Sequence, residues 1–352
     1  MTSQKIRNKL FYAIKPIVPR RTQIFLRRQI VKNKLNKYKE LWPIDPYAGE
    51  PPSDWKGWPE KKNFALVLSH DVDTQRGHDR VRKLMEIEER LGVRSAFNFV
   101  PERYTVSYDL IRELKYRGFQ VGIHGLNHDG KLFNSRKIFE KRSKRINHYL
   151  KAWQSIGFTS PCMHHNLEWM HLLDILHSTS TFDTDPFEPQ PDGIRTIFPL
   201  WVSNQGQPNR GFVELPYTLP QDHLLFVIMQ HTNIDIWKKK LAWIAEKGGM
   251  ALLNTHSDYM GMRGSKLSLE EYPIDYYIAF IEHVKSAYKG KYWHGLPREL
   301  VSFLAKKSSN DEFMGRVKSF EHMYPAWLRK NSKERATTAS SEQPKPEDRS
   351  YN

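Results

Sequence analysis

Cysteine is almost absent from this 352-residue sequence, which contains one, Cys162. A single cysteine excludes an internal disulfide framework and any zinc site built on cysteine thiolates. Long apolar runs are absent too, because no stretch approaches the roughly 18–20 residues that a transmembrane helix needs. The basic N-terminus has neither a continuous apolar segment nor a small-residue cleavage site, so we expect no secretory signal. These absences favour a cytoplasmic protein in a reducing compartment.

Acidic residues are scarce at one end of the chain. Residues 1–40 hold twelve Lys and Arg but a single acid, Glu40, and carry +11 of the formal net charge of +16. The positive charge therefore belongs to an appendage, which argues against nucleic acid as the partner of the main body. The second half of this segment predicts a helix with an apolar and a cationic side. This helix either makes a peripheral contact with an anionic membrane or is a solvated basic arm.

Strand-like and helix-like patterns alternate between residues 63 and 305, which predicts an α/β fold with a parallel sheet, most simply a (β/α) barrel. Residues 41–62 are rich in Pro and Trp and predict an irregular connector. Residues 306–352 predict a C-terminal extension that ends, beyond Lys330, in a disordered tail. The expected helices lie at residues 80–91, 108–117, 135–155, 166–176, 236–246, 274–286 and 298–305, and the expected strands at 64–72, 95–100, 119–124, 194–202, 212–215 and 250–256.

The run from Phe64 to Asp73 joins the pattern of a buried strand to charged residues at its end. Carboxylates are costly inside a strand, but at the carboxyl end of a parallel strand they face the mouth of an α/β fold. Because side chains alternate along a strand, Asp71 and Asp73 point the same way and divide naturally into a base and a metal ligand. This stretch alone fits a solvated loop with an Asp cap equally well.

Two later strand ends carry histidines. His124 and His128 follow one predicted strand, and a pair at this spacing can share an ion if the residues between form a helical turn. With Asp73 they make a two-histidine, one-carboxylate set with room for water, the arrangement of catalytic zinc and other Lewis-acid sites. A lone histidine is more often structural, but this pair favours a metal. His256 ends another strand, so Asp71 and His256 can supply the base and the acid of a hydrolysis.

Taken in order, Asp71-Val-Asp73, His124-x-x-x-His128 and the late Leu-x-x-His256 resemble the polysaccharide deacetylase family. This is the NodB-homology fold of carbohydrate esterase family 4. The resemblance implies a distorted (β/α) barrel in which Asp71 is the base and His256 the acid. It implies that Asp73, His124 and His128 bind a divalent metal, expected to be Zn²⁺. It also implies a hydrolase that removes N-acetyl, or alternatively O-acetyl, groups from a sugar, a polysaccharide or a lipid-linked glycan intermediate.

The resemblance covers residues 62–290 and fails at one motif. The family usually carries Arg-x-Pro, whose arginine pairs with the catalytic aspartate, but here Thr159 stands two residues before Pro161. Either another cation such as Arg94 supplies the charge, or Asp71 holds its proton more tightly than usual, or the enzyme is impaired. The last alternative leaves a deacetylase-like protein that binds glycans or serves as a scaffold.

Five further residues close to these strand ends are predicted to contact the substrate: Pro161, His165, Asn166, Asp183 and Asp185. Alternatives stay open for three of them. Asn166 is equally suited to cap a helix. Asp183 and Asp185 also suit an Asp-Pro turn, or they could orient His256.

Overall fold

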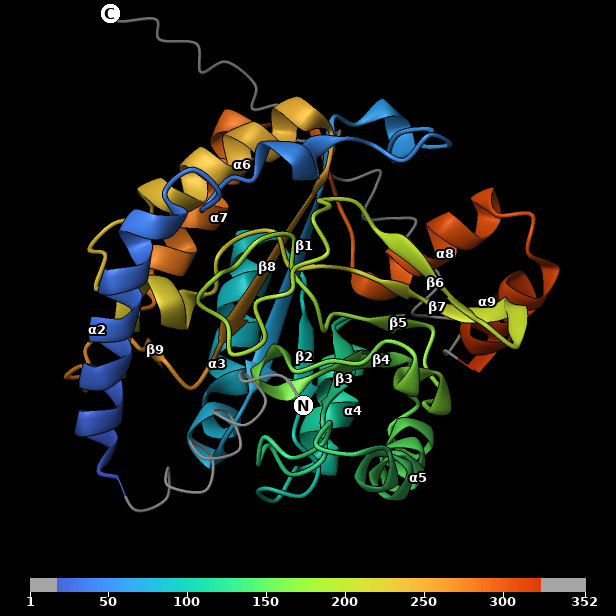
Figure 1. Ribbon diagram of the computed structural model, residues 1–352, viewed down its shortest axis with the longest axis horizontal. Coiled ribbons are helices and arrows are strands. Elements are labelled where there is room, and N and C mark those ends of the chain that lie inside the picture. The colour runs from blue at the N-terminus through green and yellow to red at the C-terminus, as the bar shows by residue number, and fades with distance from the viewer. Residues whose placement is uncertain (1–17, 324–352) are drawn as a thin grey trace, which may run out of the picture.

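The computed structural model describes residues 18–323; residues 1–17 and the predicted disordered tail beyond Lys330 lie outside the described residues. A nine-stranded sheet curls around a central axis, with helices packed around it (Figure 1). The predicted α/β class and distorted (β/α) barrel are therefore confirmed. Among residues 18–323, no helix combines the length and the apolar character that crossing a membrane requires.

The elements follow the predicted alternation closely. The helices are α2 (Arg20–Tyr38), α3 (Gln75–Leu91), α4 (Tyr108–Tyr116), α5 (Arg136–Ala152), α6 (Asp235–Lys247), α7 (Asp275–Ala287), α8 (Pro297–Lys307) and α9 (Asp311–Met323). The strands are β1 (Phe64–Val72), β2 (Ala96–Phe99), β3 (Gln120–His124), β4 (Gly157–Thr159), β5 (His177–Ser178), β6 (Leu200–Asn204), β7 (Gln207–Glu214), β8 (Met250–His256), β9 (Met260–Gly261), β10 (Tyr272–Pro273) and β11 (Tyr292–His294). A short π-helix, η5 (His223–Ile228), lies between β7 and α6.

Strand β1 is central to the sheet. It pairs in parallel with β8 on one side and with β11 and then β2 on the other, and β3, β4, β5 and β7 continue the order. After β7 the chain runs between the two ends of this sheet, because Tyr217 bridges to Phe182 and Leu219 bridges to Leu253. These two parallel bridges close the barrel. β6 and β7 form an antiparallel pair beside α9, on the opposite side of the molecule from α7 (Figure 1).

The alternation of β1 separates structural from chemical side chains. All nine of its residues are buried. His70 points outward, where its Nε2 lies 2.8 Å from Glu88 of α3 and its Nδ1 lies 2.7 Å from Thr255. Asp71, one residue later, points into the barrel toward the amides of the neighbouring strands. Because side chains alternate along a strand, His70 pairs with Glu88 at the sheet–helix interface, whereas Asp71 faces the mouth of the barrel.

Two predicted elements need correction, and one helix was not predicted. The helix predicted at residues 166–176 is only a 3₁₀ turn, Trp169–Leu172, because the chain must extend again to enter β5. The strand predicted from residue 194 begins at Leu200. Helix α9 was missed within the predicted C-terminal extension, and its buried Phe313, Val317 and Phe320 pack on the barrel. Its apolar residues recur every three to four positions, so the period was present in the sequence.

Candidate active site

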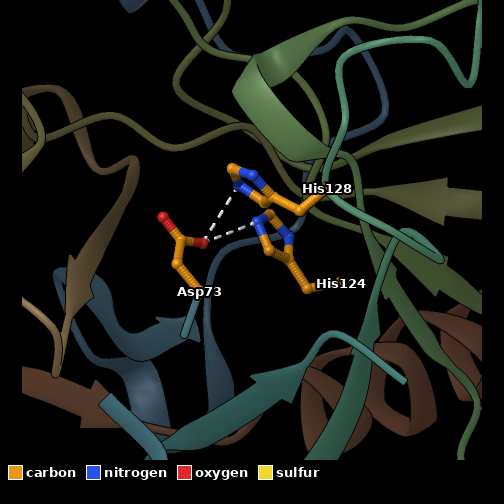
Figure 2. Close-up of side chains that lie close together, drawn as sticks. All are labelled: Asp73, His124 and His128. Atoms are coloured by element: carbon orange, nitrogen blue, oxygen red, sulfur yellow. Dashed lines mark ion pairs between the residues drawn. The ribbon is translucent and has the colours of Figure 1, made fainter. Parts of the chain in front are cut away.

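Asp73, His124 and His128 converge at the carboxyl ends of β1 and β3 (Figure 2). Asp73 Oδ1 lies 3.3 Å from His124 Nε2 and 3.1 Å from His128 Nε2. One ligand atom from each residue lies within 4.8 Å of the others. Asp73 and His124 are buried and His128 is half-buried. The three residues that the sequence grouped as metal ligands are therefore close enough to share one ion.

The loop that carries His128 is not the helical turn that the spacing suggested. Residues 125–130 form bends, and the backbone enters the left-handed region at Gly125 (φ 62°) and at His128 (φ 52°). A Cβ at Gly125 would lie 2.4 Å from Pro161 Cγ, so only glycine fits there. Pro161 thus packs under the loop and supports the position of His128. The expectation of a helical turn was wrong, although the two histidines do meet.

The donors of this cluster suit a divalent cation. His124 Nδ1 lies 3.2 Å from the carbonyl of Thr159 and donates to it, which leaves a lone pair on Nε2. Among the described residues, no donor forms a hydrogen bond with the buried Asp73 Oδ1. Burial alone would raise the pKa of Asp73, but His128 and His124 outweigh it and hold that pKa well below its ordinary value. A charged oxygen without a donor, facing two imidazole nitrogens, is the environment that a bound zinc ion would satisfy.

Asp71 lies beside this cluster and is held by neutral groups. Its Oδ1 accepts from Asn98 Nδ2 at 3.0 Å and its Oδ2 accepts from Asn254 Nδ2 at 2.8 Å. Asn98 comes from β2 and Asn254 from β8, the strands that flank β1. A Cβ at Gly122 of β3 would lie 2.1 Å from Asn98 Oδ1, so this glycine makes room for the amide. Two asparagines therefore orient the carboxylate.

No arginine occupies the place that the family's motif predicts. Thr159 is buried, and its hydroxyl hydrogen-bonds to that of Thr179. Arg94, the suggested substitute, lies before the amino end of β2 and donates to the carbonyls of Arg117 and Val93. That end of the strand is opposite the mouth, so Arg94 does not serve Asp71. The imidazole of His124 lies beside Asp71, with its Nδ1 3.7 Å from Asp71 Oδ1.

His256 ends β8 directly beside Asp71, its partner in the sheet register. Its Nδ1 lies 2.7 Å from Asp222 Oδ1, and its backbone N–H donates to Asp222 Oδ2 at 2.8 Å. Burial lowers the pKa of His256, but the charge and hydrogen bond of Asp222 outweigh burial and raise it to about 10. The sequence left open whether the carboxylates of residues 183–188 orient His256, and the structure shows that they do not. Asp222 does so, and Tyr272 steadies it with a hydroxyl at 2.9 Å.

The residues predicted to contact the substrate fall into different surroundings. His165 is half-buried, and its Nδ1 donates to the Met163 carbonyl at 2.9 Å. Asn166 Oδ1 accepts from the backbone N–H of Trp169 at 3.0 Å, which is the capping role left open beside substrate contact. Asp183 is buried in an ion pair with Lys240 at 2.5 Å. These interactions give Asn166 and Asp183 structural partners, whatever they contribute to binding.

Asp185 belongs to a buried acidic cluster near His256. The hydroxyl of Tyr217 lies 3.0 Å from Asp185 Oδ2 and 3.3 Å from Glu188 Oε1. Burial and the neighbouring Glu188 raise the pKa of Asp185 to about 8. The charge of His256 acts on Glu188, which places this cluster on the acid side of the site. Of the other predicted contacts, Pro161 lies against Gly125, in the loop that carries His128.

Comparison with known proteins bears on the fold. No family model and no curated protein matches the sequence. A structure described as a polysaccharide deacetylase from Mycobacterium smegmatis is 18% identical, with 73% of this chain and 94% of that chain covered and a TM-score of 0.52. A structure so described from Pseudomonas aeruginosa PAO1 is 14% identical, with 76% of this chain and 99% of that chain covered and a TM-score of 0.53. The structure of Puue allantoinase is 15% identical, with 74% of this chain and 96% of that chain covered and a TM-score of 0.53. The chain thus has the polysaccharide deacetylase fold, and the resemblance predicted from its motifs is confirmed at that level.

Proposed function

We propose that this protein is a metal-dependent hydrolase that removes acetyl groups from the nitrogen, or alternatively the oxygen, of a sugar in a glycan or lipid-linked intermediate. The observation that carries the proposal is the meeting of Asp73, His124 and His128, with Asp71 and His256 beside them. Two structural neighbours described as polysaccharide deacetylases support it. Each side chain has a distinct task in this reaction.

The metal would be held by Asp73 Oδ1 and by the Nε2 atoms of His124 and His128. When bound, a divalent ion polarises an acyl carbonyl and makes water a better nucleophile at neutral pH. The carbonyl of Thr159 fixes the ring of His124, and the carboxylate of Asp258 accepts the backbone N–H of Asp73 at 2.8 Å. These outer contacts keep the ligand atoms facing one another.

Asp71 takes the proton from the attacking water. Each of its oxygens accepts one amide N–H, and an ionised carboxylate has further lone pairs to receive a proton. His256 gives a proton to the departing amine. Its Nδ1–H is held by Asp222, so its Nε2–H is free to act as the acid. With a pKa near 10, this imidazole keeps that proton at neutral pH.

The test is acetate release from N-acetylated and O-acetylated glycans by the purified full chain, with its metal content measured in parallel. We expect Asp71→Asn to keep the metal and to lose activity by about 10²–10⁴-fold, the usual contribution of a general base. The alternative is an impaired glycan-binding or scaffold protein, which the threonine at position 159 favours. Retained metal with no acetate from any glycan would support that alternative and contradict the hydrolase.

Contact with an anionic membrane stays a proposal for the basic N-terminal segment, as does the predicted cytoplasmic location. Helix α2 exposes Phe25, Leu26 and Ile30, each by more than half, among its basic residues. Replacing all three with serine should weaken flotation with anionic vesicles by about tenfold or more, because apolar burial drives such binding. Acetate release from a soluble substrate should not change. Equal flotation of variant and wild type would contradict the proposal.

A further inference from the structure

Helix α2 packs over the loops that follow the carboxyl ends of the strands. Arg28 donates to the Val227 carbonyl from Nε at 3.1 Å and from a terminal nitrogen at 2.9 Å. Lys34 donates to the Pro186 carbonyl at 3.1 Å, and Arg20 pairs with Glu270. Buried Ile24 and Val31 dock the same side of the helix. The described part of the basic segment is therefore a fixed wall of the mouth, with apolar residues on both its inner and its outer face.

Arg27 lies on this wall without a close partner. It is half-buried, and within residues 18–323 no hydrogen bond or ion pair engages its guanidinium. Its charge acts on Asp185, Glu188 and His223, which places it over the acid side of the mouth. Partial burial of an unpaired guanidinium costs desolvation free energy. A bound anion would offset that cost, so such a group favours an anionic ligand.

The nearby acids do not neutralise Arg27. Asp185 and Glu188 share the Tyr217 hydroxyl, and burial raises the pKa of both carboxyls. Because Asp185 has a pKa of about 8, this pair retains a proton at neutral pH. The positive charge of Arg27 is thus only partly offset by the pair.

His223 adds a second, independent sign of a missing ligand. Its side chain is buried, with the residue 8% exposed, and its Nε2 has no hydrogen-bond partner in the part of the chain that the structure describes. Its ring lies 4.7 Å from that of Tyr259, which lies 5.1 Å from that of His256. The charges that act on His223 are the cations Arg27, His256 and Arg20 and one carboxylate, Asp73. His223 therefore lies between α2 and the acid of the proposed reaction.

We propose that Arg27 and His223, with Arg20 at the rim, form a subsite for a phosphate group carried by the substrate. A guanidinium and a buried imidazole N–H supply several donors to one anion, the pattern that suits the multiple oxygens of a phosphate. This inference rests on the proposed function and narrows its substrate class to an N-acetylated sugar phosphate. The phosphate is a free monoester or a diester to a lipid-like chain, and both present the same chemistry to these donors.

Binding, measured by calorimetry on the metal-loaded full chain, tests this without any turnover. The probes are N-acetylglucosamine, N-acetylglucosamine 1-phosphate and the short-chain alkyl phosphodiester of the same sugar. At least one phosphorylated probe should bind about tenfold tighter than the neutral sugar, as charge-assisted hydrogen bonds commonly give. The tighter of the two identifies the source as free or lipid-linked.

The variants are Arg27→Gln and His223→Phe, with Arg21→Gln as the matched control. Arg21 belongs to the same helix but is exposed, so its loss removes the same charge without touching the subsite. The phosphate advantage should disappear in Arg27→Gln and in His223→Phe and persist in Arg21→Gln. An equal loss in Arg21→Gln, or no advantage in the wild type, would overturn the subsite. Tight phosphate binding without acetate release would instead contradict only the proposed hydrolysis.

Discussion

On one side of the Asp73–His124–His128 cluster, Asp71 lies between the amides of Asn98 and Asn254, and on the other His256 lies against the carboxylate of Asp222. Both side chains, the proposed base and the proposed acid, are buried and come from the central pair β1–β8. A nearby charge stabilises one protonation state strongly, whereas neutral amides mainly fix direction. Neutral amides therefore fix the direction of Asp71, the proposed base. The carboxylate of Asp222 fixes the direction of His256, the proposed acid, and also stabilises its protonated form. The predictions below test this difference.

The largest effect is expected from the cluster that both sides share. His124→Ala removes a proposed metal ligand, so metal affinity should fall by more than the roughly 10–100-fold that loss of an outer-shell partner costs. Acetate release should fall with it. Metal analysis after dialysis and the activity assay measure the two losses. His148→Ala, an exposed histidine on α5, is the control and should change neither.

On the acid side, Asp222→Asn should lower kcat by about 10²-fold, the lower range for general acid catalysis. It should also change the pH profile. Asp222 holds the pKa of His256 at about 10, so His256 gains its proton below that pH and loses it above. Without the charge this pKa falls, and the alkaline limb of kcat moves to lower pH. Tyr272→Phe, which removes only a hydroxyl donor to Asp222, should move the limb less.

If Asp222→Asn leaves the alkaline limb of kcat unchanged, a group other than His256 determines that limb. The proposed electrostatic difference between the two sides would then be wrong.

On the base side, Asn98→Ala should lower kcat by about tenfold, because one of two donors to the charged Asp71 is lost. Gly122→Ala should have a similar effect, since its methyl group would displace the Asn98 amide. Neither variant should change the metal content or move the alkaline limb. Steady-state kinetics across pH, with metal analysis, check this. Wild-type kcat in both variants would mean that the amides do not position Asp71.

The sequence indicated which side chains converge where the signal lies at the ends of strands. Asp71 lies near the end of β1, Asp73 directly follows that strand, and His124 and His256 end two other strands, so period and position indicated a common mouth. Asn98 and Asn254 were missed as partners of Asp71, although each is a polar residue inside an apolar strand. Which polar residues meet depends on register between strands, and single-strand patterns do not carry register.

Other features were hidden in backbone conformation. The spacing of His124 and His128 is the same in a helical turn and in the bent loop that the structure has, so only the glycine at 125 hinted at the loop. Asp222 was not predicted as the partner of His256, because 34 residues separate the two in the sequence. The sequence predicted one apolar side for α2. In the structure its apolar residues point to two sides, so its outward apolar face was not predicted.

The most direct test of the account is a crystal structure of the zinc-loaded chain with anomalous scattering recorded on both sides of the zinc absorption edge. The account predicts one anomalous peak about 2.0–2.2 Å from Asp73 Oδ1 and from the Nε2 atoms of His124 and His128, the usual zinc distances. No peak there, or a peak at another cluster of the chain, would contradict it.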